Sequence, residues 1–109
     1  SEVLREFASE RDWKKFHSPK NLVMALQGEL GELAEHFQWI TEEESFHIKG
    51  SESEDAVSQE VSDVFLYLIR LADQLGIDLY KEALKKVELN RKKYPVGKSY
   101  GKSTKYNKL

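Results

Sequence analysis

Apolar side chains recur every three to four residues in four stretches of the chain, with polar or helix-breaking residues between them. This period predicts amphipathic helices that each turn one face to a core. We expect the first helix over residues 2–13 and the second from Pro19 to Ile40. A third helix ends at Gly76, and a fourth runs from Asp78 to Pro95.

Several residues at the predicted helix ends are typical of caps. Ser18 is a favoured N-cap, and the proline that follows it suits the first helical position. Gly76 favours the left-handed conformation that ends a helix, and Asp78 is suited to cap the next one. Residues 41–53 are polar and acidic and contain one glycine, so we expect a loop there.

Four amphipathic helices without any strand pattern predict an all-α fold, an antiparallel four-helix bundle. We assign residues 1–95 to this helical domain. Residues 96–109 contain glycine, serine and lysine in place of apolar periodicity, so we expect a flexible C-terminal tail. A domain of this length buries only about two thirds of its unfolded surface, which favours association between copies.

The composition argues against several classes of function. The 17 basic and 19 acidic side chains nearly balance, so no overall field attracts a nucleic acid polymer or an anionic membrane. No apolar run approaches the roughly 20 residues that cross a bilayer. Because the chain has no cysteine, it has neither disulfides nor thiolate metal sites, and we expect a cytoplasmic protein.

Two pairs of acidic residues border the apolar stripes of the second and third predicted helices. Glu29 and Glu32 are three residues apart, and Glu60 and Asp63 repeat that spacing, which places each pair on one helical face. Four converging carboxylates would lose hydration and repel one another unless a cation joins them. Oxygen ligands alone suit Mg²⁺, with Mn²⁺ as a substitute.

Two other interpretations of the acidic pairs stay open at this point. Acidic residues three apart are also common on solvated helix surfaces. A di-iron bundle also places glutamates on facing helices, but it requires paired Glu-x-x-His motifs. That spacing occurs at Glu44 and His47, inside the predicted loop, which counts against a di-iron site.

The motifs Glu29-Leu-Gly-Glu32 and Glu60-Val-Ser-Asp63 resemble the E-x-x-E…E-x-x-D signature of the MazG-like, all-α nucleotide pyrophosphohydrolases. Further segments resemble the dCTP pyrophosphatase branch of that family, and together they cover residues 4–95. These segments are Phe7-Ala-Ser-Glu-Arg-Asp-Trp13, Phe16-His17, Pro19, Gly31-Glu-Leu-Ala-Glu35, Phe37-Gln-Trp39 and Asn90-Arg-Lys-Lys-Tyr-Pro95. The combination is much more specific than the acidic signature alone.

The resemblance implies a hydrolase that converts a (deoxy)nucleoside triphosphate and water to the monophosphate and diphosphate. It implies dCTP or a modified dCTP as the preferred substrate, and nucleotide-pool sanitation as the role. It also implies Mg²⁺ held by Glu29, Glu32, Glu60 and Asp63, with Glu29 or Glu32 as the catalytic base. The site would be built within a homo-oligomer, either a homodimer or a dimer of dimers.

The resemblance further implies that eight residues bind the substrate. Aromatic planes would stack on the base, and cations and amides would meet the phosphates. The eight are Trp13, Lys14, His17, Trp39, Tyr67, Lys86, Asn90 and Arg91. The aromatic residues could instead belong to the core, His17 could be a helix-boundary residue, and the basic residues of the last helix could form a solvated face.

Leu4 departs from the family pattern, in which the vertebrate dCTP-hydrolysing relatives carry histidine three residues before the phenylalanine that matches Phe7. Leucine cannot hydrogen-bond a pyrimidine edge, so a different preferred base stays open. Two other functions also stay open: a nucleotide-binding or regulatory module without catalysis, and a purely structural bundle.

Overall fold

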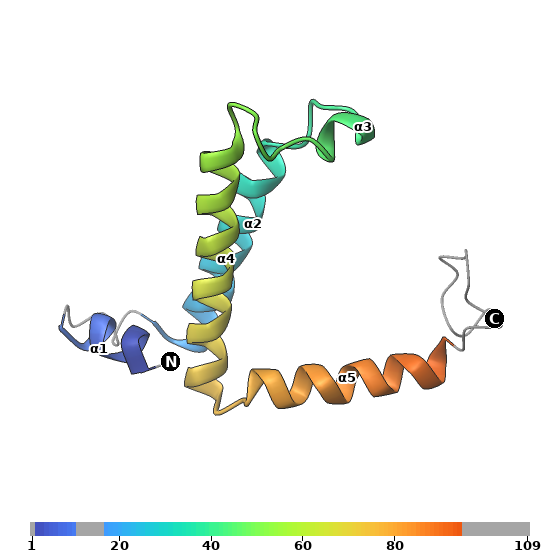
Figure 1. Cartoon of the computed structure of the whole chain (residues 1–109). Helices are drawn as coiled ribbons and strands as arrows, with labels where there is room; N and C mark the ends of the chain where they lie inside the picture. Colours follow the sequence, from blue (N-terminus) through green and yellow to red (C-terminus); the bar gives the residue numbers. More distant parts are fainter. Residues whose placement is uncertain (1, 11–16, 95–109) are drawn as a thin grey trace. The chain divides into compact units, whose positions relative to one another are not determined.

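The computed structural model describes residues 2–10 and 17–94 of the chain. Within these residues the chain forms helices and no strand (Figure 1), so the predicted all-α class is confirmed for this part. The helices are α1 (Glu2–Glu10), α2 (Pro19–Glu35), α3 (Glu42–Ser45), α4 (Glu54–Leu75) and α5 (Leu79–Lys93). Residues 11–13 of the first predicted helix and the predicted tail lie outside the described residues.

The predicted caps of the long helices are confirmed. The Ser18 hydroxyl accepts a hydrogen bond from the Asn21 backbone N–H at 3.1 Å, with proline at the start of α2. Gly76 ends α4 in the left-handed conformation, with a φ of 68°. Asp78 then caps α5, where its Oδ1 accepts from the Lys81 backbone N–H at 3.1 Å. Each cap satisfies a backbone group that the helix leaves without an internal partner.

The second predicted helix is shorter than its apolar period suggests, because α2 ends at Glu35 and not at Ile40. The His36 backbone N–H donates to the Leu33 carbonyl at 3.1 Å, a three-residue bond that tightens the last turn. The chain then continues through turns over residues 36–39. Phe37 remains half-buried there, so the apolar pattern continues past the helix because burial continues.

The predicted loop over residues 41–53 contains the short helix α3, so the prediction was wrong for that stretch. The Thr41 hydroxyl accepts from the Glu44 backbone N–H, and the Glu44 carboxylate accepts from the Thr41 backbone N–H, both at 3.1 Å. This reciprocal pair is the capping box of a helix start, and acidic residues in the first turn suit the helix dipole. The Thr-x-x-Glu pattern that specifies α3 is visible in the sequence.

The core lies between α2 and α4, which run antiparallel and have by far the most contacts of any helix pair (Figure 1). Leu22 of α2 is 1% exposed, and Val57 and Ala72 of α4 are also buried. α1 makes a smaller contact with α4. This antiparallel pair brings the acidic motif of α2 to the acidic motif of α4.

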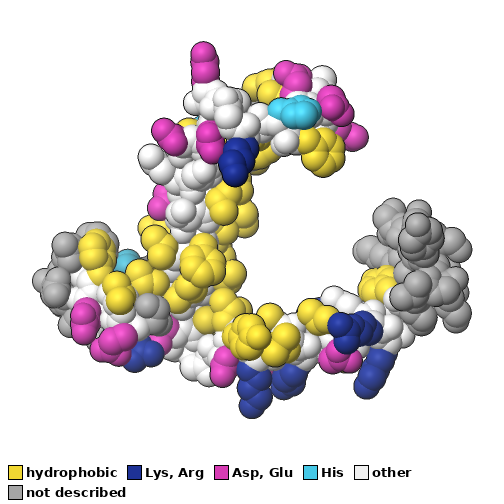
Figure 2. Space-filling view, in the orientation of Figure 1, with side chains coloured by type: hydrophobic (Ala, Val, Ile, Leu, Met, Phe, Trp, Pro, Cys, Tyr) yellow, Lys and Arg dark blue, Asp and Glu magenta, His cyan; other side chains and the backbone are white. Residues whose placement is uncertain are grey.

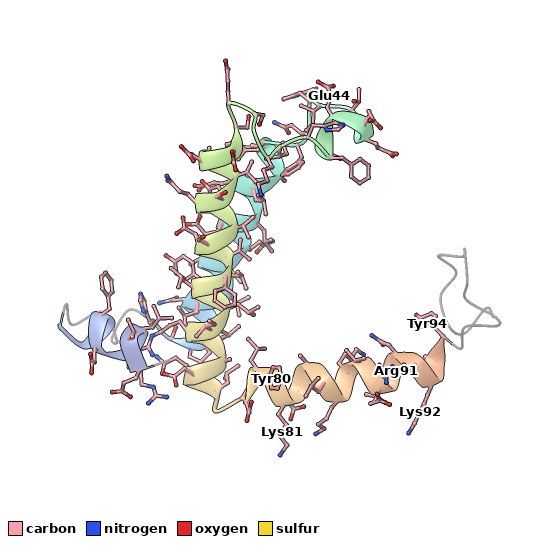
Figure 3. All side chains as sticks on the ribbon, viewed as in Figure 1. Glu44, Tyr80, Lys81, Arg91, Lys92 and Tyr94 are labelled. Carbon is pink, nitrogen blue, oxygen red and sulfur yellow. The ribbon has the colours of Figure 1, made fainter. Side chains whose placement is uncertain are left out.

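The chain divides into two compact units, Ser1–Gly76 and Ile77–Leu109. In the second unit no residue of α5 is fully buried, and its apolar side chains gather on one face (Figure 2). Lys81 and Lys92 project from another side of that helix (Figure 3). Packing of four helices into one bundle stays a prediction. None of the described helices combines the length and apolar character needed to cross a bilayer.

Candidate functional site

Three of the four predicted acidic residues converge between α2 and α4. Glu29 of α2 and Glu60 and Asp63 of α4 each place a carboxylate oxygen within 4.8 Å of the other two. The spacing of three residues puts Glu60 and Asp63 on one face of α4, and the antiparallel packing sets Glu29 against that face. The result is a cluster of oxygen ligands with no cation from the described residues paired to it.

The acidic cluster is electrostatically strained without a cation. Burial raises the pKa of Glu29 from 4.5 to about 7, and the hydrogen bond with Glu60 and the charges of the neighbouring carboxylates act in the same direction. One buried oxygen of Glu29 and one of Glu60, both Oε2, have no hydrogen-bond partner in the described structure. Buried polar atoms are normally satisfied, so these two atoms indicate a missing partner.

A hard divalent cation fits this donor set. Mg²⁺ and Mn²⁺ prefer carboxylate oxygens, and the described cluster offers neither histidine nor thiolate. Such a cation would supply the partner that the two orphaned oxygens lack, and it would relieve the repulsion that adds to the effect of burial on the Glu29 pKa. The residues present therefore fit the predicted metal.

Glu32 lies near the cluster without joining its three converging oxygens. Its charge contributes to the raised pKa of Glu29, which places it within electrostatic reach. Its side chain is exposed on α2. A ligand or base role for Glu32 therefore stays a prediction.

A pocket of about 210 Å³ adjoins the acidic cluster, and Asp63 belongs to both. A cavity of about 150 Å³ already holds a benzene ring, so the pocket has room for a planar ring. The pocket is lined by Leu4 and Phe7 of α1, by His17, and by Asp63, Leu66, Tyr67 and Arg70 of α4. His17 and Tyr67, two of the predicted nucleoside-binding residues, are thus brought together beside the cluster.

His17 enters the pocket from the segment before α2. The Gln74 side-chain amide donates to the His17 carbonyl oxygen at 2.7 Å, which ties this segment to α4. Burial lowers the pKa of His17, and the positive charge of Arg70 lowers it further. At neutral pH the imidazole is therefore uncharged, which suits contact with a neutral base.

Arg70 is a pocket residue that the sequence interpretation missed. Its Nη1 donates to Asp73 Oδ2 at 3.0 Å, and Arg5 Nε donates to both Asp73 oxygens at 2.9 and 3.0 Å. Two features of the sequence could have identified it: Arg70 is the one charged residue in the run Val64–Ala72, and it follows Tyr67 by three and Asp63 by seven residues. Such spacings place it on the face that carries both.

Trp39 is not among the described residues that line this pocket. Trp39 lies in the turns after α2 and is 86% exposed. Lys86, Asn90 and Arg91 lie on α5 in the second unit, where Arg91 pairs with Glu88. Trp13 and Lys14 lie outside the described residues. Substrate roles for these six residues stay predictions.

The known proteins that are similar to this chain are MazG-like proteins and pyrophosphatases. The model of the MazG-like family matches residues 25–109. The chain is 49% identical to dCTP pyrophosphatase 1 of Bos taurus and 48% identical to that of Homo sapiens, in each case over 95% of this chain and 62% of the relative. It therefore spans about 62% of the length of these curated relatives.

A solved structure is also similar to this chain. The crystal structure of a pyrophosphatase from Archaeoglobus fulgidus superposes with a TM-score of 0.78 at 38% sequence identity. The match covers 86% of this chain and 87% of the archaeal chain. The helical arrangement described above is thus shared with a protein of known structure.

Proposed function

We propose that this chain, which belongs to the MazG-like family, is a Mg²⁺-dependent nucleoside triphosphate pyrophosphohydrolase that prefers dCTP or a modified dCTP. The observation that carries the proposal is the shared residue Asp63, which joins a cluster of carboxylates to a pocket of ring size. A nucleoside triphosphate needs a metal site for its phosphates and, beside that site, a pocket for its base. The names of the mammalian relatives and of the archaeal pyrophosphatase support this choice.

The acidic cluster would hold the cation that the phosphates require. Glu29, Glu60 and Asp63 supply three converging ligands, and Glu32 would complete the set from the neighbouring turn of α2. When bound, Mg²⁺ supplies neutralisation of phosphate charge, polarisation of the attacked phosphorus and a lowered pKa of a bound water. Cleavage between the α and β phosphates would give the monophosphate and diphosphate.

The carboxylates of α2 would also handle the proton of the attacking water. A general base has to lie within hydrogen-bond reach of that water. Glu29 lies in the cluster and Glu32 lies beside it, so either could accept the proton without moving far.

The base of the nucleotide would occupy the pocket next to the cluster. Tyr67 offers an aromatic plane there, and the neutral His17 offers a second ring. Stacking on such rings contributes on the order of 1–3 kcal/mol per base. Trp13 and Trp39 would add further planes, and Lys14, Lys86, Asn90 and Arg91 would meet the phosphates.

The active protein would be a homo-oligomer, either a homodimer or a dimer of dimers. Large apolar side chains are exposed on the single chain, among them Val61 and Phe65 of α4 and Leu84 and Leu89 of α5. Exposed apolar surface on each of these helices supports an association surface. A second copy would cover these faces and complete a helical bundle around the site.

The test is pyrophosphate release from dCTP, 5-methyl-dCTP, dUTP, dTTP, dATP, dGTP and the ribonucleotides, each with Mg²⁺ and with a chelator. We expect metal-dependent release that is fastest with dCTP or 5-methyl-dCTP. Faster release from another nucleotide would keep the reaction and change the preferred base. Tight triphosphate binding without release would instead indicate a binding module, and neither binding nor release would indicate a structural bundle.

A further inference from the structure

We propose that Arg70 determines which base the pocket accepts, by donating hydrogen bonds from its free guanidinium edge to the adjacent O2 and N3 acceptors of cytosine. This inference rests on the proposed function, because it assigns a specificity residue to the same pocket. The environment of the Arg70 side chain supports this role.

Arg70 is buried in the wall of an otherwise mostly apolar pocket. The residue is 6% exposed, and its pocket neighbours include Leu4, Phe7 and Leu66. Removing a charged group from water is unfavourable unless its hydrogen bonds are replaced. A guanidinium in this position therefore needs partners on every edge.

Only part of that need is met within the described residues. The Nη1 atom of Arg70 donates to Asp73 Oδ2 at 3.0 Å, which fixes the orientation of the planar group. The Nε atom is buried and has no hydrogen-bond partner in the described structure. Because the guanidinium presents its donors as a rigid fork, the anchored Nη1 leaves the Nε edge as a preset pair of donors.

Arg70 shares its anion with a second guanidinium group. Asp73 is the shared anion of both Arg70 and Arg5, with the Arg5 Nε at 2.9 Å from Asp73 Oδ1. One carboxylate therefore serves two guanidinium groups. Arg5 also pairs with Glu2, at 3.3 Å, and the positive charge of Arg70 lowers the pKa of His17. A ligand edge made of acceptors is the complement of this wall.

Cytosine presents that edge, whereas uracil and thymine do not. The O2 and N3 atoms of cytosine are adjacent acceptors that match two parallel N–H groups, and a matched pair of this kind discriminates strongly between bases. In uracil and thymine the N3 atom carries a hydrogen and would oppose a donor. Leu4 lines the same pocket and has no polar atom to offer, whereas Arg70 offers a charged donor among the described lining residues.

The experiment compares steady-state hydrolysis of dCTP and 3-deaza-dCTP, in which a C–H group replaces N3. For the wild-type chain we expect KM for 3-deaza-dCTP to exceed that for dCTP by about 10-fold or more, with kcat changed much less. In Arg70→Met, which keeps length but has no donor, we expect KM for dCTP to rise until the two nucleotides differ less than about 2-fold.

Arg5→Gln is the matched control. It also removes a guanidinium from Asp73, but Arg5 does not line the pocket. We expect it to keep the wild-type ratio between the two nucleotides. Loss of that ratio in Arg5→Gln, or its retention in Arg70→Met, would overturn the inference by making Arg70 a structural residue.

Two further outcomes keep the inference separable from the proposed function. If Arg70→Met does not fold, the wild-type chain alone decides, since equal KM values for the two nucleotides would overturn the role of N3. If the wild-type chain releases no pyrophosphate from any nucleotide, the proposed reaction fails. Calorimetric binding of dCTP and 3-deaza-dCTP then decides the inference, with tighter binding of dCTP in its favour and equal binding against it.

Discussion

Asp63 and Asp73 lie on the same helix, α4. Asp63 belongs to a cluster of carboxylates, whereas Asp73 belongs to a cluster in which a carboxylate meets guanidinium groups. Asp63 meets Glu29 and Glu60 with no cation from the described residues, whereas Asp73 is shared by the guanidinium groups of Arg5 and Arg70. The described part of the chain supplies the counter-charge of the second cluster and not that of the first. The comparison teaches that a carboxylate cluster points to an external cation only where the fold leaves it without internal partners.

The acidic cluster gives the largest expected effect. We expect Glu60→Gln and Asp63→Asn each to reduce pyrophosphate release from dCTP by at least about 100-fold, because each removes a charged metal ligand. Without metal, both variants should remain as stable as the wild type, because each also removes one of the repelling charges. Circular dichroism melting checks the second point.

Glu52→Gln is the matched control for these two variants, since Glu52 is exposed outside the cluster. It should retain wild-type turnover. Turnover retained in Glu60→Gln or Asp63→Asn would contradict the metal role of the cluster.

We expect the cluster of Arg5, Arg70 and Asp73 to contribute to the stability of the fold. Asp73→Asn removes the anion that holds Arg70, whose side chain is 7% exposed against 18% for Asp73. Breaking a pair this buried leaves an uncompensated charge, and we expect the free energy of unfolding to fall by about 2–4 kcal/mol. Urea denaturation measures the change. A loss below about 0.5 kcal/mol would show that Arg70 does not depend on Asp73.

The metal-free acidic cluster should also make stability depend on pH. Because the folded-state pKa of Glu29 is raised from 4.5 to about 7, the folded chain holds a proton that the unfolded chain releases. The stability that this bound proton contributes to the folded chain is fully present below about pH 4.5 and is lost as the pH rises through about 7. In chelator we expect the Tm to fall across this window.

A variant and a metal titration isolate the contribution of Glu29 to this pH dependence. Glu29→Gln, which cannot ionise, should flatten the chelator curve. Excess Mg²⁺ should raise the Tm of the wild type most at the alkaline end, because the cation binds the ionised cluster of the native state. A Tm in chelator that is constant from pH 5 to pH 8 in the wild type would contradict the raised pKa.

The smallest expected effect comes from the outer arginine of the second cluster. The Arg5 side chain is half exposed, so solvent screens its pairing with Asp73. We expect Arg5→Gln to lower the free energy of unfolding by only about 0.5–1 kcal/mol, measured by urea denaturation. A loss as large as that of Asp73→Asn would instead make the bond between α1 and α4 a principal stabilising contact.

The sequence predicts the helices well because caps and apolar period are local signals. Ser18, Gly76 and Asp78 each act within one helical turn, and each lies where expected. The extension of the second helix to Ile40 failed, because half-buried turns keep an apolar period without helical hydrogen bonds. α3 was overlooked because the acidic residues after Thr41 resembled a solvated loop, although the capping box is present.

The candidate site also contains residues that the sequence predicts and residues that it does not predict. The spacing of Glu29, Glu60 and Asp63 predicts a shared face, and the packing of α2 against α4 brings these carboxylates together. The spacing of Arg70 after Asp63 and Tyr67 places it on their face, but its pairing with Asp73 and the lining of the pocket by α1 are contacts that spacing does not give. Trp39 falls inside the second predicted helix, but α2 ends at Glu35, so the position of Trp39 follows from turns that the apolar period does not predict.

The exposure of Trp39 makes it an optical reporter of its surroundings. An indole that is 86% exposed in the single chain should emit at the long wavelengths typical of water-facing tryptophan. With Trp13→Phe, the emission would come from Trp39 alone, since the chain contains two tryptophans. A blue shift on raising the protein concentration would report burial by a second copy, whereas quenching that requires added dCTP would report a nucleotide against the ring.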